Sequence, residues 1–76
     1  MKKIGPFPGD VKPVREGIYQ CVYTKSIRLW SYWNGSYWGS MESVPDIAWK
    51  YRDFRNGYQD LPWYGIEKPQ HERKTS

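Results

Sequence analysis

The hydrophobic and polar positions of the chain fall into short segments with distinct periods. In residues 17–24, GIYQCVYT, the alternation of side chains predicts a β-strand. One side of this strand would carry Tyr19, Cys21 and Tyr23, and the other side would carry Ile18, Gln20 and Val22. Both sides are mostly apolar or aromatic, so we expect a central strand that is covered on both faces.

The next segment, residues 29–39 (LWSYWNGSYWG), predicts a β-hairpin around Asn34-Gly35, because both turn residues tolerate positive φ. A type I′ turn would pair Tyr32 with Tyr37, whereas a three-residue loop with a bulge at Gly35 would pair Trp30 with Trp38. Both registers stay open. In the type I′ register one face holds Trp30, Tyr32 and Tyr37, and the other holds Leu29, Trp33 and Trp38. A small sheet has one core side, so some of these rings are expected to lie outside the core.

Residues 43–57 have the spacing of an amphipathic helix. Ser43 is the expected N-cap, Pro45 suits the first turn, and Asn56-Gly57 is a typical stop signal. The stripe expected to pack on the sheet consists of Val44, Ile47, Ala48, Tyr51 and Phe54. Trp49 should project away from that stripe, beside Asp46 and Asp53.

A last short strand is expected over residues 61–66, LPWYGI, where Pro62 is typical of an edge strand. The elements then follow the order β-β-β-α-β, which predicts an α+β fold: a small antiparallel sheet with one helix packed on it. Residues 1–16 are expected to be an extended Pro-rich lead-in, residues 17–66 a single domain, and residues 67–76 a disordered polar tail.

Composition narrows the functional classes. A chain of 76 residues buries only about 60–65% of the surface that it exposes when unfolded, and its only cysteine, Cys21, cannot form an internal disulfide. A lone thiol, with neither a secretion signal nor a long apolar run, predicts a cytoplasmic protein without a membrane segment. The formal charge of +4 lies mostly at the ends, because residues 10–66 hold seven basic and six acidic side chains. This distribution weakens a nucleic-acid interpretation.

Catalysis is not expected from this inventory. The only histidine, His71, lies in the polar tail, and Cys21 lies inside a predicted strand. The sequence contains no phosphate-binding loop and no spacing typical of metal ligands. We therefore predict a protein that is not an enzyme and needs no cofactor or metal.

The surplus rings instead favour binding. Trp and Arg dominate protein interfaces, which makes Trp49 with Arg52 the first candidate for contact with a protein partner. Alternatively, Trp49 packs under the lead-in near Pro6 and Phe7 or Pro8, and Trp63 closes the sheet.

A second hypothesis is a sheet that stacks unpaired bases of single-stranded nucleic acid. Its platform would be Trp30, Tyr32, Tyr37 and Arg28. A third is a nucleotide held between two copies of the chain, and a homodimer through an exposed aromatic face is also left open.

Three segments resemble small uncharacterised proteins carried by tailed phages and prophages. They are PGDVKPVREGIY (residues 8–19), YWNGSYWG (residues 32–39) and the closing WYGI (residues 63–66). Those proteins share a Pro-rich lead-in to a strand, an aromatic hairpin and a closing Trp-x-Gly strand, in which Arg usually stands at the position of Tyr64. The resemblance assigns no catalytic or binding residue. It implies a phage accessory protein that binds and inhibits a host protein in the host cytoplasm, in host takeover or suppression of defences such as CRISPR systems.

Overall fold

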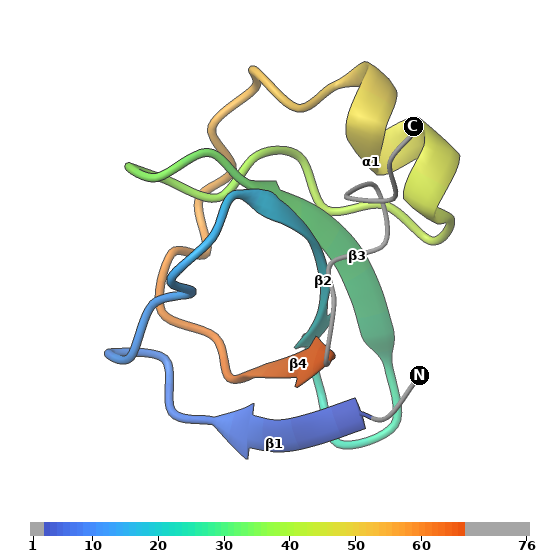
Figure 1. The fold of residues 1–76 in the computed structure, drawn as a ribbon. Coiled ribbons are helices and arrows are strands. Elements are labelled where there is room, and N and C mark those ends of the chain that lie inside the picture. The colour runs from blue at the N-terminus through green and yellow to red at the C-terminus, as the bar shows by residue number, and fades with distance from the viewer. Residues whose placement is uncertain (1–2, 67–76) are drawn as a thin grey trace.

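The computed structural model describes residues 3–66, which form one four-stranded antiparallel sheet and one short helix (Figure 1). The elements along the chain are β1 (Lys3–Phe7), β2 (Gly17–Val22), β3 (Arg28–Trp33), α1 (Pro45–Lys50) and β4 (Trp63–Ile66). Across the sheet the strands lie in the order β1-β4-β2-β3. The predicted combination of a small antiparallel sheet and one helix is confirmed, and the predicted tail, 67–76, lies outside the described residues.

β2 is the central strand that the alternation predicted. It pairs with β3 from Gly17↔Trp33 to Val22↔Arg28, and with β4 on its other side through Cys21↔Trp63. Both neighbours run antiparallel to it.

The first and last strands differ from the prediction. β1 lies inside the expected lead-in and pairs with β4 through Ile4↔Gly65. β4 is therefore an interior strand, and the prediction of an edge strand over residues 61–66 is wrong. Pro62 precedes β4, where its missing N–H costs no ladder bond, and its carbonyl accepts a bond from the Val22 N–H at 2.8 Å. The predicted element order β-β-β-α-β is found along the chain, but with a different set of strands. The first strand is β1, and the strand expected after the Asn34-Gly35 turn does not form.

Both predicted hairpin registers are wrong. Trp33 pairs with Trp38 across a four-residue loop, residues 34–37. The Asn34 side-chain oxygen accepts the backbone N–H groups of Ser36 and Tyr37, each at 2.8 Å, and closes the loop. A type I′ turn needs positive φ at both central residues, but only Gly35 adopts it here, at 94°.

The segment after this loop lies along the outer edge of β3 without forming a regular strand. Trp30 and Glu42 exchange two backbone hydrogen bonds of 2.7 and 2.8 Å, and the Gly39 N–H donates to the Tyr32 carbonyl at 2.8 Å. These bonds satisfy polar groups on the edge of β3 that would otherwise be open to another strand.

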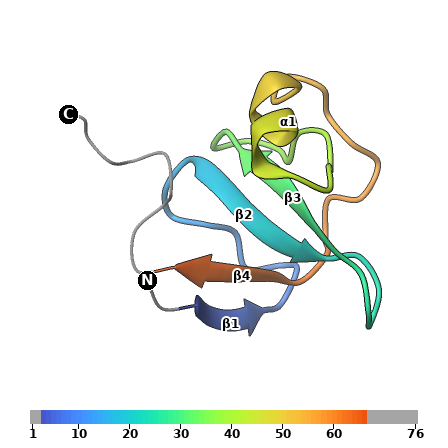
Figure 2. The same cartoon turned by 90° about the vertical axis from the view of Figure 1, so that its right-hand side faces the viewer.

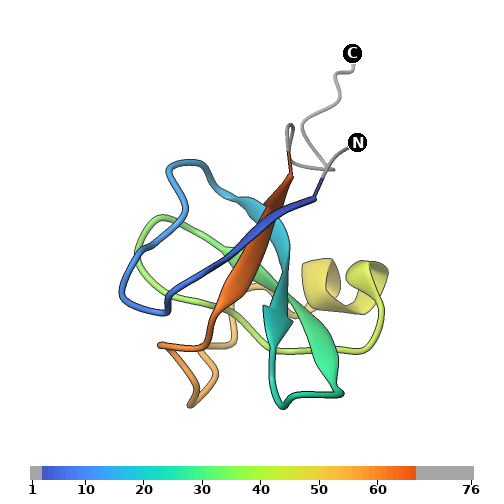
Figure 3. The same ribbon diagram turned by 90° about the horizontal axis from the view of Figure 1, so that it is seen from below.

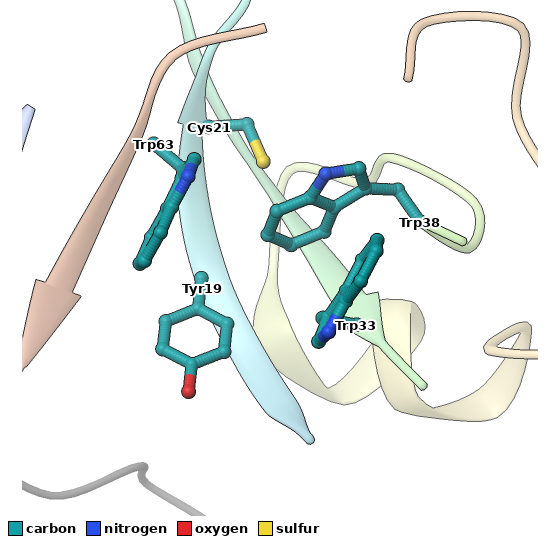
Figure 4. Packing of buried hydrophobic residues seen from close by; sticks show 5 residues of the cluster. All are labelled: Tyr19, Cys21, Trp33, Trp38 and Trp63. Atoms are coloured by element: carbon teal, nitrogen blue, oxygen red, sulfur yellow. The ribbon is translucent and has the colours of Figure 1, made fainter. Parts of the chain in front are cut away.

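The sheet curves around a core of rings (Figures 1 and 4). The cluster consists of Tyr19, Cys21, Trp33, Trp38 and Trp63, with Phe7 and Met41 packed against it. Trp38 is the most enclosed ring, with 1% of its surface exposed. Its ring lies 5.2 Å from that of Trp33 and 6.1 Å from that of Tyr19, the latter edge to face.

Loops close the side of the core opposite the sheet, and the predicted lead-in supplies one of them. The Lys12 ammonium donates to the Gln59 carbonyl at 2.6 Å and lies 3.2 Å from the Asp60 carboxylate. The Trp63 indole N–H donates to the Val11 carbonyl at 2.6 Å. Residues 8–16 and 57–62 therefore lie side by side (Figure 1).

The helix is shorter than predicted. It begins at Pro45 after an N-cap at Val44 rather than Ser43, and no side chain caps it. The chain leaves the helix at Tyr51, because residues beyond it bind the hairpin loop: the Asn56 N–H donates to the Trp38 carbonyl at 3.2 Å. This long-range bond overrides the continued helical pattern up to residue 57.

The side of the helix that faces the sheet differs in part from the prediction. Ala48, a member of the predicted core stripe, is fully buried, but the other four stripe residues are exposed, and Trp49, which was expected to project away, contacts Tyr32 on β3. Figure 3 shows α1 on one side of the sheet and the loop of residues 8–16 on the other, so the helix covers the outer face of the curved sheet. The exposed residues of the stripe are Val44, Ile47, Tyr51 and Phe54, of which only Ile47 lies within α1.

Candidate functional site

Three of the six predicted site residues meet where α1 lies against β3 (Figure 2). The Tyr32 and Trp49 rings are 5.3 Å apart and nearly perpendicular, at 73°. The Arg52 guanidinium lies 3.9 Å from the centre of the Trp49 ring and donates to the Trp49 carbonyl at 2.8 Å. We call Tyr32, Trp49 and Arg52 the stacked triad.

Within the triad, the exposed fraction of the ring increases from the sheet toward solvent. Tyr32 is 9% exposed and Trp49 is 42% exposed, so the Tyr32 ring supports a half-open indole. This arrangement differs from the alternative in which Trp49 packs under the lead-in, because the Phe7 ring packs against Trp63 instead, with the ring centres 4.7 Å apart and the planes tilted by 34°. The triad therefore combines an anchored base with an accessible outer layer.

Tyr32 also connects the triad to Glu16. The phenol donates to a Glu16 carboxylate oxygen at 3.4 Å. Burial of the ring and the nearby Glu16 charge raise the pKa of Tyr32, so it stays a neutral donor at physiological pH.

Tyr37 lies beside the triad but does not face Tyr32. Its hydroxyl donates to the Asp53 carbonyl at 3.2 Å, and the Arg55 guanidinium lies 5.6 Å from its ring centre. The hairpin loop and the turn after α1 are thereby joined, with a second cation placed over a second ring.

The remaining two candidates, Arg28 and Trp30, lie further along β3. The Arg28 guanidinium stands 5.2 Å from the ring centre of Tyr64 and donates to its hydroxyl at 3.3 Å. Gln20 is in register with both Trp30 and Tyr64, so these two residues lie on the same face, with their Cα atoms roughly 10 Å apart across two strand spacings. Both rings are half-buried.

Three of the six residues, Arg28, Trp30 and Tyr32, thus lie on one face of β3. Trp49 and Arg52 lie at the adjoining end of α1 and Tyr37 lies in the hairpin loop, and the six are not gathered into one pocket. Sequence reasoning missed two members of this face, Tyr64 and Glu16. The alternation of Tyr64 with Trp63 in the closing strand was a usable signal, because Trp63 fills the core and its neighbour must face the other way. No comparable signal marks Glu16, which meets Tyr32 only through the fold.

The described side chains offer little nucleophilic chemistry. Burial raises the pKa of the Cys21 thiol to about 12, which keeps it protonated and unreactive. Within residues 3–66 no three His, Cys, Asp or Glu side chains come together as a potential metal-ligand set. His71 lies outside the described residues. The same part of the chain contains no helix with the length and apolarity needed to cross a bilayer.

Comparison with protein-family models, with curated proteins and with solved structures finds no match for this chain.

Proposed function

We propose that this chain is a non-enzymatic binding protein of the phage accessory type, which holds and inhibits a host protein through the stacked triad and the neighbouring ring–arginine pairs. The observation that carries the proposal is the half-exposed Trp49 ring, supported by Tyr32 below and covered by Arg52. Trp, Tyr and Arg are the residues that contribute most to protein interfaces. A ring already held in place loses little entropy when it binds.

Charge also favours a protein partner over a nucleic acid. Residues 10–66 carry a net charge of only +1, whereas phosphate contacts need several unpaired cations. Three guanidinium groups near the candidate rings, those of Arg28, Arg52 and Arg55, lie over Tyr64, Trp49 and Tyr37. The cations over Trp49 and Tyr37 each occupy a ring face that a base would need.

The second candidate, binding of single-stranded nucleic acid, rests on the row formed by Trp30, Gln20 and Tyr64 with Arg28 at its end. Two half-buried rings on one sheet face with a nearby cation resemble a base-stacking platform. The two candidates use different parts of the same face, so substitutions separate them.

The experiment is capture from bacterial lysate with the full-length tagged chain, comparing Trp49→Ala and Arg52→Ala with Tyr58→Ala. Tyr58 is an exposed ring whose contact is Tyr23, away from the triad, and serves as the matched control. We expect the two triad variants to lose at least tenfold of the captured partner, about 1.4 kcal/mol or more, while the control retains it. Equal capture by all three variants would reject the triad as the contact surface.

A further inference from the structure

Two guanidinium groups follow α1 closely, and each lies over an aromatic ring. The Arg52 guanidinium lies 3.9 Å from the ring centre of Trp49. The Arg55 guanidinium lies 5.6 Å from that of Tyr37, whose hydroxyl donates to the carbonyl of Asp53 at 3.2 Å. Because the two arginines are three residues apart, their Cα atoms lie at most about 11 Å from each other. Both ring–arginine pairs therefore belong to one small part of the surface.

Most N–H donors of these two groups are open. A guanidinium group has five N–H donors in one plane. Arg52 uses one of them in the bond from Nη1 to the Trp49 carbonyl, and its other donors and those of Arg55 form no hydrogen bond to another residue of 3–66. The stack on the indole and this bond together hold the Arg52 plane in place. A partner therefore meets a preorganised fork of donors rather than a freely moving side chain.

Neither guanidinium group has a carboxylate partner in the part of the chain that the structure describes. The ion pair found there joins Lys12 to Asp60. Asp53 stands between the two arginines in the sequence but forms an ion pair with neither. The Glu16 carboxylate accepts the Tyr32 hydroxyl. The open donors of the two arginines are therefore available to carboxylates of another molecule.

Positive charge is concentrated at the same place. Residues 50–55 contain three basic side chains and one acidic one, a net charge of +2. Residues 10–66 as a whole carry only +1, so the rest of this range is slightly negative. The third cation, Lys50, also lies over a ring, 5.5 Å from the ring centre of Tyr51. This local excess favours a partner surface of negative charge.

The geometry favours carboxylates as the source of that negative charge. A guanidinium group stacked on a ring can still bind a carboxylate edge-on, through two parallel N–H···O bonds. Phosphates share this geometry, but a nucleic-acid strand needs several cations along its backbone and open ring faces for its bases. Here the arginines cover one face each of Trp49 and Tyr37. Asp and Glu side chains of a protein need only the two guanidinium edges.

We propose that the partner of the stacked triad presents an acidic protein segment, in which one Asp or Glu carboxylate binds Arg52 and a second binds Arg55. The half-exposed Trp49 ring supports the first of these contacts. This inference rests on the proposed function and adds the chemistry of the partner. Salt should weaken the association, because it screens charges that lie at the surface.

The first test compares two substitutions of Arg52 in the full-length tagged chain, with nuclease-treated bacterial lysate as the source of the partner. Arg52→Lys keeps the positive charge, whereas Arg52→Met keeps an unbranched apolar chain that can pack on the indole. An acidic partner favours the lysine, and an apolar partner favours the methionine. We expect Arg52→Lys to retain at least about tenfold more captured protein at low salt, and the difference to shrink at about 0.5 M NaCl.

Lys25→Met is the matched control for the loss of charge. Lys25 is exposed in the turn before β3, at the opposite end of that strand from Tyr32 (Figure 1). This variant should capture as much protein as the wild type, and the near-ultraviolet circular dichroism of the tryptophan core should be the same in all variants. Capture by Arg52→Met that equals or exceeds capture by Arg52→Lys would overturn the proposal, as would an equal loss in Lys25→Met.

The second test identifies the carboxylates themselves. In Arg52→Lys and Arg55→Lys, a carbodiimide joins the new amine to a carboxylate in direct contact, through an amide bond without a spacer. Mass spectrometry of the captured complex should show both positions linked to Asp or Glu residues of the partner. The native Lys25 amine should form no such link and serves as the internal control.

The proposed function and the acidic partner fail in different ways. If the wild-type chain captures no protein, the proposed function is wrong and the acidic partner is rejected with it. If the chain captures a protein that Arg52→Met holds as well as Arg52→Lys does, or one that is cross-linked at neither position, only the acidic partner is wrong.

Discussion

The Tyr32 ring stands edge to face against the Trp49 ring at 5.3 Å, and this contact joins the helix to the sheet. Such pairs contribute about 0.5–1.5 kcal/mol beyond the area they bury. Together with the buried Ala48, the contact sets which side of α1 faces the sheet.

The first prediction concerns Trp49, which both packs against Tyr32 and is proposed to bind the partner. Trp49→Ala should lower the free energy of unfolding by about 1–2 kcal/mol, because a half-exposed ring loses one packed face. Trp38→Ala should cost about 3–5 kcal/mol, because Trp38 is 1% exposed at the centre of the core. Urea titrations followed by tryptophan fluorescence give both values. Equal costs at the two positions would show that Trp49 is a core residue rather than a binding residue.

The second prediction concerns Gln59, whose side-chain amide pairs with the backbone of Trp38 as a neighbouring strand would. Its amide oxygen accepts the Trp38 N–H at 2.8 Å, and its amide N–H group donates to the Trp38 carbonyl at 3.0 Å. Gln59→Glu replaces the donor by an oxygen facing that carbonyl, so we expect a loss of about 1–3 kcal/mol.

Asp60→Asn is the control for Gln59→Glu. It changes a neighbouring, exposed carboxylate whose pairing with Lys12 is worth less than about 1 kcal/mol. Thermal unfolding of the two variants at neutral pH makes the comparison. A Gln59→Glu protein as stable as the wild type would contradict the role given to this side chain.

The third prediction separates two glycines. A Cβ atom at Gly39 would overlap the carbonyl oxygen of Arg52, whereas a Cβ at Gly57 would meet nothing within 4 Å. Gly39→Ala should therefore cost at least about 1–3 kcal/mol and displace the turn that carries Arg52. Gly57→Ala should be neutral or stabilise by up to about 1 kcal/mol. Denaturant midpoints for both variants test the close approach of Gly39 to the Arg52 backbone, and similar midpoints would contradict it.

The fourth prediction concerns pH and Cys21. Burial raises the pKa of its thiol from 9.0 to about 12, so the native protein should react with a thiol reagent only after unfolding. Because the folded state holds the proton more tightly, this contribution to stability is full below about pH 9 and is lost as the pH rises toward 12. The raised pKa of Tyr32 acts in the same direction.

Stability measured between pH 7 and pH 11 in wild type and Cys21→Ala checks this sign, because this range lies on both sides of the ordinary thiol pKa of 9.0, above which the loss begins. The variant should lose less stability at the alkaline end. Rapid labelling of Cys21 in the native protein at neutral pH would contradict its burial.

The sequence predicted β2 well, because a strand with neighbours on both sides and a covered face shows its alternation directly. It could not predict the hairpin register, since the Asn34 side chain closes a loop that neither turn template contains. β1 was missed because Pro6 and Pro8 argue against a strand, although an edge strand tolerates them.

The helix illustrates a different limit. Its apolar stripe was recognised from Val44 to Phe54, but long-range contacts set its direction and length. Trp49 contacts Tyr32, and the segment ending in Gln59 is held to Trp38. The whole stripe was therefore expected to pack on the sheet, whereas Ala48 is its only buried member. For the candidate site, sequence reasoning found Trp49, Arg52 and Tyr32 as residues, but not the contacts among them.

The central claim is that the chain acts by binding a host protein through the stacked triad and the neighbouring ring–arginine pairs. The most direct measurement is capture from bacterial lysate with and without nuclease, reading both the bound proteins and the ratio of absorbance at 260 nm to that at 280 nm. The account predicts one discrete host protein that survives nuclease and is lost with Trp49→Ala. Bound nucleic acid that disappears with nuclease and leaves no protein behind would contradict it, and would favour base stacking by Trp30 and Tyr64.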